Sequence, residues 1–90
     1  MRQRLLTPEQ VQPVMTQQRA ICMDTARQMH QLEQVRQWWQ QDKRPVEPEI
    51  AHLVERLLRE ETLRVQERYQ QAEGLLRYAQ YCLATYQQQR

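Results

Sequence analysis

Apolar residues recur at spacings of three and four from Val11 to Trp39, which is the pattern of one face of an α-helix. Placed at about 100° per residue, they fall on one broad arc, and its members are Val11, Val14, Met15, Ile21, Cys22, Met29, Leu32, Val35 and Trp39. Two polar residues, Gln18 and Thr25, lie near the middle of the arc. The pattern predicts an amphipathic helix over residues 8–41.

The start of this helix is marked by Thr7, Pro8 and Gln10. Thr7 suits the N-cap, Pro8 suits the first helical position, and Gln10 completes a capping box. Pro13 follows too closely, because a proline inside a helix removes one backbone hydrogen bond. Either a separate first turn precedes Pro13, or one continuous helix kinks there.

A second apolar pattern predicts a helix over residues 48–88, beginning at Pro48. Its seam alternates steps of four and three, the heptad spacing of packed helices, through Val54, Leu58, Glu61, Val65, Arg68, Ala72, Leu75, Ala79, Cys82 and Tyr86. Gly74 is the one position that could break this helix, although a lone Gly costs only about 1 kcal/mol relative to Ala.

The segment over 42–47 is the only clear connection, since Pro45 and Pro48 disfavour helix in the residues before them. If the chain reverses there, neighbouring residues have numbers that sum to about 89, which sets Trp39 beside Ile50, Leu32 beside Leu57 and Val14 beside Leu75. The sequence therefore predicts one all-α domain over residues 1–90, an antiparallel helical hairpin. Two helices alone enclose little core, so we expect a four-helix bundle, formed either with a second copy or with a different chain.

Two charged residues, Glu61 and Arg68, occupy seam positions one heptad apart. Polar residues in a seam can fix register and partner choice at a cost in stability. The alternative is that the hairpin is open at this level and both residues are solvated.

The end of the second helix is apolar on more than one face, so one neighbouring helix does not cover it. Tyrosine is favoured at protein interfaces, and Tyr78 and Tyr81 are expected to point away from the hairpin. The predicted docking surface consists of Leu75, Leu76, Tyr78, Tyr81, Cys82, Leu83 and Tyr86. The alternative is that these residues form the protein's own core. Trp38, which faces away from the first arc, is a further candidate contact beside the connection.

The composition argues against an active site. There are 18 Gln residues, no Ser or Asn, and a single Gly, so the chain has few of the residues that build the loops on which catalytic groups usually lie. Glu49 and His52 match a Glu-x-x-His spacing used in di-iron bundles, but they lie off the apolar stripe. We therefore expect no enzyme activity, metal or cofactor.

The net charge of +2 and the two cysteines, Cys22 and Cys82, fit a reduced cytoplasmic protein without a membrane segment. The sequence favours a non-catalytic protein-binding module, such as a small adaptor, chaperone or regulatory subunit. The alternative is a helical hairpin that binds nucleic acid through the basic group Lys43, Arg44, Arg56, Arg59 and Arg64, although glutamates are interleaved with it.

Overall fold

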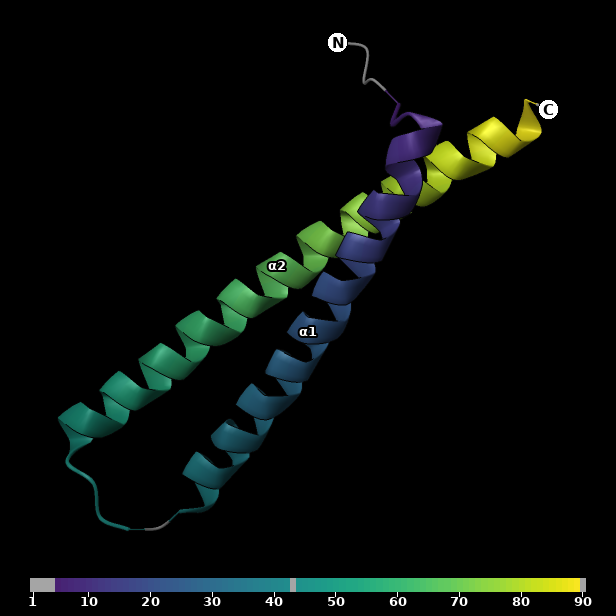
Figure 1. Ribbon diagram of the computed structural model, residues 1–90. Coiled ribbons are helices and arrows are strands. Elements are labelled where there is room, and N and C mark those ends of the chain that lie inside the picture. The colour runs from purple at the N-terminus through teal and green to yellow at the C-terminus, as the bar shows by residue number, and fades with distance from the viewer. Residues whose placement is uncertain (1–4, 43, 90) are drawn as a thin grey trace.

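The computed structural model describes residues 5–42 and 44–89, and they form two helices packed antiparallel as a hairpin (Figure 1). Helix α1 spans Pro8–Gln41 and helix α2 spans Pro48–Gln88. The described residues contain no strand. The predicted all-α hairpin is confirmed. Helix α1 runs continuously through Pro13, and α2 runs continuously through Gly74, which has no positive φ.

Local chemistry fixes where the helices begin and how the chain turns. The backbone amide of Thr7 donates a hydrogen bond to Oε1 of Gln10 at 3.1 Å, which satisfies a group at the start of α1. After α1, Asp42 accepts hydrogen bonds from Arg44, the shortest being 2.7 Å from Nη2 to Oδ2. These bonds to the Arg44 side chain hold the pKa of Asp42 below its usual range.

The hairpin is long and thin. Its dimensions are 66 × 26 × 15 Å and its radius of gyration is 19.4 Å, whereas a compact domain of this length has a radius of gyration of about 12 Å. Each helix therefore has only one neighbour along its length, and most side chains lie at the surface.

The core lies at the end of the hairpin that carries the two termini. Val11 and Met15 of α1 pack with Ala79 and Cys82 of α2, and all four are buried. None of the described residues from 26 to 64 is buried, and in Figure 1 the two helices lie farther apart near the connection than near the termini. At the terminal end, Val14 packs against this cluster, but Leu75, predicted to lie beside it, is exposed. At the connection, Ile50 and Leu57 were predicted inside the hairpin and are about half exposed.

The inward row of α2 differs from the predicted seam at alternate positions. The shared positions Val65, Ala72 and Ala79 are buried. Between them the helix turns Tyr69 and Leu76 inward to partly buried positions, while Arg68 and Leu75 are exposed. The seam positions predicted for Arg68 and Leu75 are therefore wrong. For Arg68 the physical reason is that the ring of Tyr69 fills the interface without desolvating a guanidinium group. Leu76 lies one heptad after Tyr69, so the same rotation of α2 turns it inward in place of Leu75.

Two polar residues of α1 are buried, as their place on the apolar arc predicts. The hydroxyl of Thr25 donates to the carbonyl oxygens of Ile21 at 2.7 Å and of Cys22 at 3.2 Å. Because these acceptors lie in the same helix, Thr25 needs no partner from α2 to satisfy its hydroxyl. Gln18 is also buried. Among the described residues, no helix is both long and apolar enough to cross a membrane.

Candidate protein-binding surface

The apolar end of α2, where a docking surface is predicted, mostly contributes to the protein's own core. Cys82 is fully buried in the core cluster. The residues that pack against this cluster from α2 are Leu76, Tyr78, Leu83 and Tyr86. Only Leu75 and Tyr81 of the predicted set remain exposed, at 50% and 62%.

Tyr78 was expected to point away from the hairpin, and that expectation is wrong. Its ring packs against the core cluster, and burial, together with the neighbouring Cys82, raises the pKa of its hydroxyl above 10.0. Near the C-terminus of α2, the side of the helix that contacts α1 thus includes Tyr78. The reason is that the two helices cross there (Figure 1), so α2 does not present the same side to α1 along its whole length.

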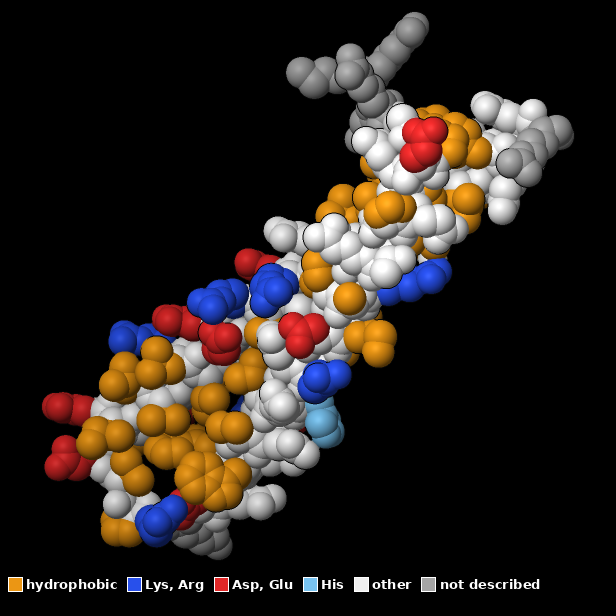
Figure 2. All heavy atoms as spheres, in the orientation of Figure 1, with side chains coloured by type: hydrophobic (Ala, Val, Ile, Leu, Met, Phe, Trp, Pro, Cys, Tyr) orange, Lys and Arg blue, Asp and Glu red, His pale blue; other side chains and the backbone are white. Residues whose placement is uncertain are grey.

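The exposed large apolar residues gather at the opposite end. Eleven such residues are exposed among those that the structure describes, and seven of them lie between residues 35 and 63. Six of the seven form what we call the loop-end surface: Val35, Trp38, Val46, Ile50, Leu53 and Leu57. Figure 2 shows apolar side chains covering the connection end of both helices, with acidic and basic groups around them.

The helical spacing explains how this surface is built. Ile50, Leu53 and Leu57 stand at positions i, i+3 and i+7 of α2, so they form a stripe along one side of the helix. They are 48%, 45% and 52% exposed, because α1 covers only one edge of the stripe. Val35 and Trp38 come from the last turns of α1. A small monomer rarely exposes a contiguous apolar patch of this kind unless the patch contacts another molecule.

Charged residues border the stripe. Glu49 and Arg56 flank it on the same side of α2, one heptad apart. Nε of Arg56 lies 4.0 Å from Oε1 of Glu60, and both side chains are about two-thirds exposed. A surface ion pair of this length contributes little stability, so these groups remain available to a second molecule.

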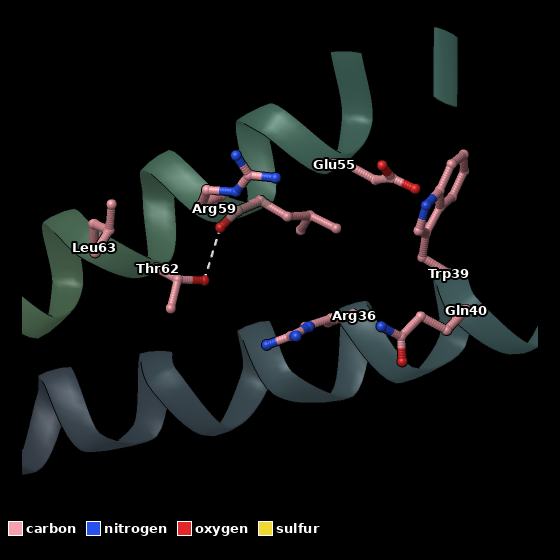
Figure 3. Close-up of a pocket in the computed structure, with 8 residues that line it drawn as sticks. Arg36, Trp39, Gln40, Glu55, Arg59, Thr62 and Leu63 are labelled. Carbon is pink, nitrogen blue, oxygen red and sulfur yellow. Dashed lines mark hydrogen bonds between the residues drawn. The ribbon is translucent and has the colours of Figure 1, made fainter. Parts of the chain in front are cut away.

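A cavity of about 310 Å³ opens between the helices near the connection. Figure 3 shows Arg36, Trp39 and Gln40 projecting from α1, and Glu55, Arg59, Thr62 and Leu63 on α2. The hydroxyl of Thr62 donates to the carbonyl oxygen of Leu58 at 2.7 Å. The lining mixes an indole ring, two guanidinium groups and one carboxylate.

A second hollow of about 310 Å³ lies between the helices farther from the connection. Gln28, Leu32 and Val35 of α1 and Glu61 and Val65 of α2 line it, together with Gln31. Glu61 is half-buried at this hollow, and its carboxylate lies 3.8 Å from Nε of Arg64. Glu61 therefore lies at the edge of the interface, whereas Arg68 lies outside it, so the two residues predicted to set register do not form one layer.

The remaining candidates are placed as follows. Trp38 is exposed and belongs to the loop-end surface. In the described part of the chain, no group of three or more His, Cys, Asp or Glu residues is arranged to hold a metal ion. Of the basic group, Arg44, Arg56 and Arg64 have acidic neighbours within 4.0 Å, and Lys43 lies outside the described residues.

Sequence reasoning missed the loop-end surface because it assigned Ile50 and Leu57 to the interface within the hairpin. The signal that could have found it was present. Leu53 and Leu57 stand beside the predicted seam rather than on it, so the apolar face of α2 is wider near residue 50 than one neighbouring helix can cover.

No protein-family model, curated protein or solved structure with which the chain was compared matches the chain.

Proposed function

We propose that this protein is a non-catalytic protein-binding module that docks an amphipathic helix on its loop-end surface. The class of function is that of a small helical adaptor, chaperone or regulatory subunit. One observation carries the proposal: Ile50, Leu53 and Leu57 form an apolar stripe that is about half exposed. A stripe at i, i+3 and i+7 is the feature by which one helix packs against another.

The surroundings of the stripe suit a helical partner. Val35 and Trp38 extend the surface across to α1, so that a helical partner seated on it can contact both helices of the hairpin. Tryptophan at such a position is a common anchor of binding energy. The border of the surface carries both acidic and basic groups, which is typical of the polar rim of a protein interface.

A photo-crosslinking residue at position 57 tests this proposal in the native host. We expect it to form a covalent adduct with a protein. The matched control is position 66, where Gln66 is exposed on the same helix and lies about half a turn away around the helix axis. We expect no adduct from position 66, and Leu53→Asp should abolish the adduct formed from position 57.

The result that contradicts the proposal is equally clear. If position 57 forms no adduct, or forms the same adducts as position 66, the loop-end surface is not a docking site. Circular dichroism of the Leu53→Asp protein controls for folding, because Leu53 is 45% exposed and lies outside the core cluster. Its helicity should be unchanged.

A further inference from the structure

We infer that the helix docked on the loop-end surface is α2 of a second copy of this chain, packed antiparallel, so that the loop halves of two hairpins form a four-helix bundle. This inference rests on the proposed function, because it names the occupant of the same surface. Three observations support it: the exposed area of the chain, the shape of the apolar stripe, and the charges beside the stripe.

The exposed area is large enough for such an interface. The chain has an accessible surface of 7878 Å² and a mass of 11.1 kDa. A compact monomer of that mass has a surface of about 5,700 Å². The difference is larger than the roughly 800 Å² that each partner buries in a stable interface of standard size. The chain can therefore bury a full dimer interface and still expose as much surface as a compact protein.

The apolar stripe is complementary to itself when it is reversed. A two-fold axis beside Leu53 places Leu53 against Leu53 of the second copy and Ile50 against Leu57 of the second copy. Isoleucine and leucine have nearly the same volume, so the reversed stripe presents similar side chains at each level. An interface formed by the same patch on both subunits is what two-fold symmetry requires.

The charges beside the stripe complete the match. In an antiparallel pair of helices, residues on one flank of a stripe face residues on the same flank of the partner. With the axis beside Leu53, Glu49 of each copy faces Arg56 of the other, and the symmetry produces this attractive pair twice. Arg56 is free to turn toward the second copy, because its contact with Glu60 is 4.0 Å long and exposed.

The same axis accounts for the apolar residues of α1. A two-fold axis that lies in the interface and runs across both helices sets α2 against α2 and α1 against α1. Val35 and Trp38, which are about half exposed in one hairpin, then meet the same residues of the second copy. The terminal halves, which already have a closed core, project in opposite directions from the bundle.

The experiment is a charge exchange, read as the mass in solution by sedimentation equilibrium. We expect the wild-type protein to sediment as a dimer. Glu49→Arg and Arg56→Glu each replace two attractive pairs by two repulsive ones. The dissociation constant of the dimer should therefore rise by about tenfold or more in each variant. In a mixture of the two variants, one chain carries arginine at both positions and the other carries glutamate at both. Every facing pair between them is then attractive, so a heterodimer should form.

Three further variants sharpen this test. Glu49→Arg combined with Arg56→Glu in one chain restores both pairs in a homodimer, which separates a charge effect from a folding defect. Glu55→Arg and Arg59→Glu make the same charge changes on the side of α2 that lines the cavity, and they should leave the dimer intact.

Several outcomes overturn the inference. They are a wild-type protein that is monomeric throughout the micromolar range, a dimer that neither charge variant weakens, and single variants that do not associate on mixing. An adduct at position 57 that contains a different protein overturns the second copy as occupant while the proposed function stands. If no adduct forms at all, both fail.

Discussion

The hydroxyl of Tyr86 in α2 donates a hydrogen bond to the backbone carbonyl oxygen of Leu6, 80 residues away in the sequence. This bond joins the segment before α1 to the last turns of α2, next to the core cluster that both residues help to cover. The hairpin is thus closed at its terminal end by apolar packing and a side-chain hydrogen bond. At the connection end, the described residues are at most partly buried.

Removal of the Tyr86 hydroxyl tests the importance of this closure. Tyr86→Phe keeps the ring and deletes the donor, which leaves the Leu6 carbonyl oxygen without its partner. We expect the free energy of unfolding to fall by about 1 kcal/mol, measured by urea denaturation followed by circular dichroism. Tyr81→Phe is the control, because Tyr81 is 62% exposed. Equal losses in the two variants would contradict this role for Tyr86.

The difference between the two ends also predicts different costs for one substitution. Val11→Ala removes two methyl groups from a residue that is 1% exposed, whereas Val35→Ala removes them from one that is 46% exposed. We expect the first to lower the free energy of unfolding by about 2 kcal/mol and the second by less than about 1 kcal/mol. Denaturation at a protein concentration low enough to keep the chains monomeric measures both.

Gly74 is an opportunity to stabilise the protein. It lies inside α2 with a helical backbone, and a Cβ atom added there would meet no atom within 4 Å beyond its chain neighbours and the backbone of α2 itself. Gly74→Ala should therefore raise the free energy of unfolding by about 0.5–1 kcal/mol, because alanine loses less backbone entropy on folding. The midpoint of thermal unfolding reports the change. A lower midpoint would contradict this prediction and would show that the helix is less stable with a side chain at position 74.

The fold class and the seam positions Val65, Ala72 and Ala79 could be predicted from the sequence, because hydrophobic spacing and the prolines around 42–48 define two helices and one reversal. The seam positions of Cys82 and Tyr86 are also correct, but those of Arg68 and Leu75 are not. Arg68 and Tyr69, like Leu75 and Leu76, are adjacent residues, and either row fits a heptad. The choice depends on how far α2 rotates about its axis, which packing and the cost of burying charge decide.

The candidate surface was harder to predict for a related reason. A pattern of apolar residues shows which side of a helix is buried, but it does not contain the angle at which two helices cross. The prediction that neighbouring residues have numbers that sum to about 89 assumes that the two helices lie side by side along their whole length. It therefore placed Ile50 and Leu57 inside the hairpin. In the structure, contact is closest where Val11 meets the last turns of α2, and the apolar residues near the connection remain exposed.

The raised pKa of Tyr78 predicts loss of stability in alkaline solution. Burial of its ring and the neighbouring Cys82 favour the neutral hydroxyl in the folded state, so its pKa lies above the ordinary value of 10.0. A proton is then held more tightly by the folded chain than by the unfolded one. The contribution to stability is complete below pH 10 and is lost as the pH rises through the pKa of the folded state. The free energy of unfolding, measured by denaturation at several pH values across this range, should therefore fall less steeply with pH for Tyr78→Phe than for the wild-type protein, because phenylalanine has no proton to lose. Parallel curves for the two proteins would show that Tyr78 ionises equally easily in both states.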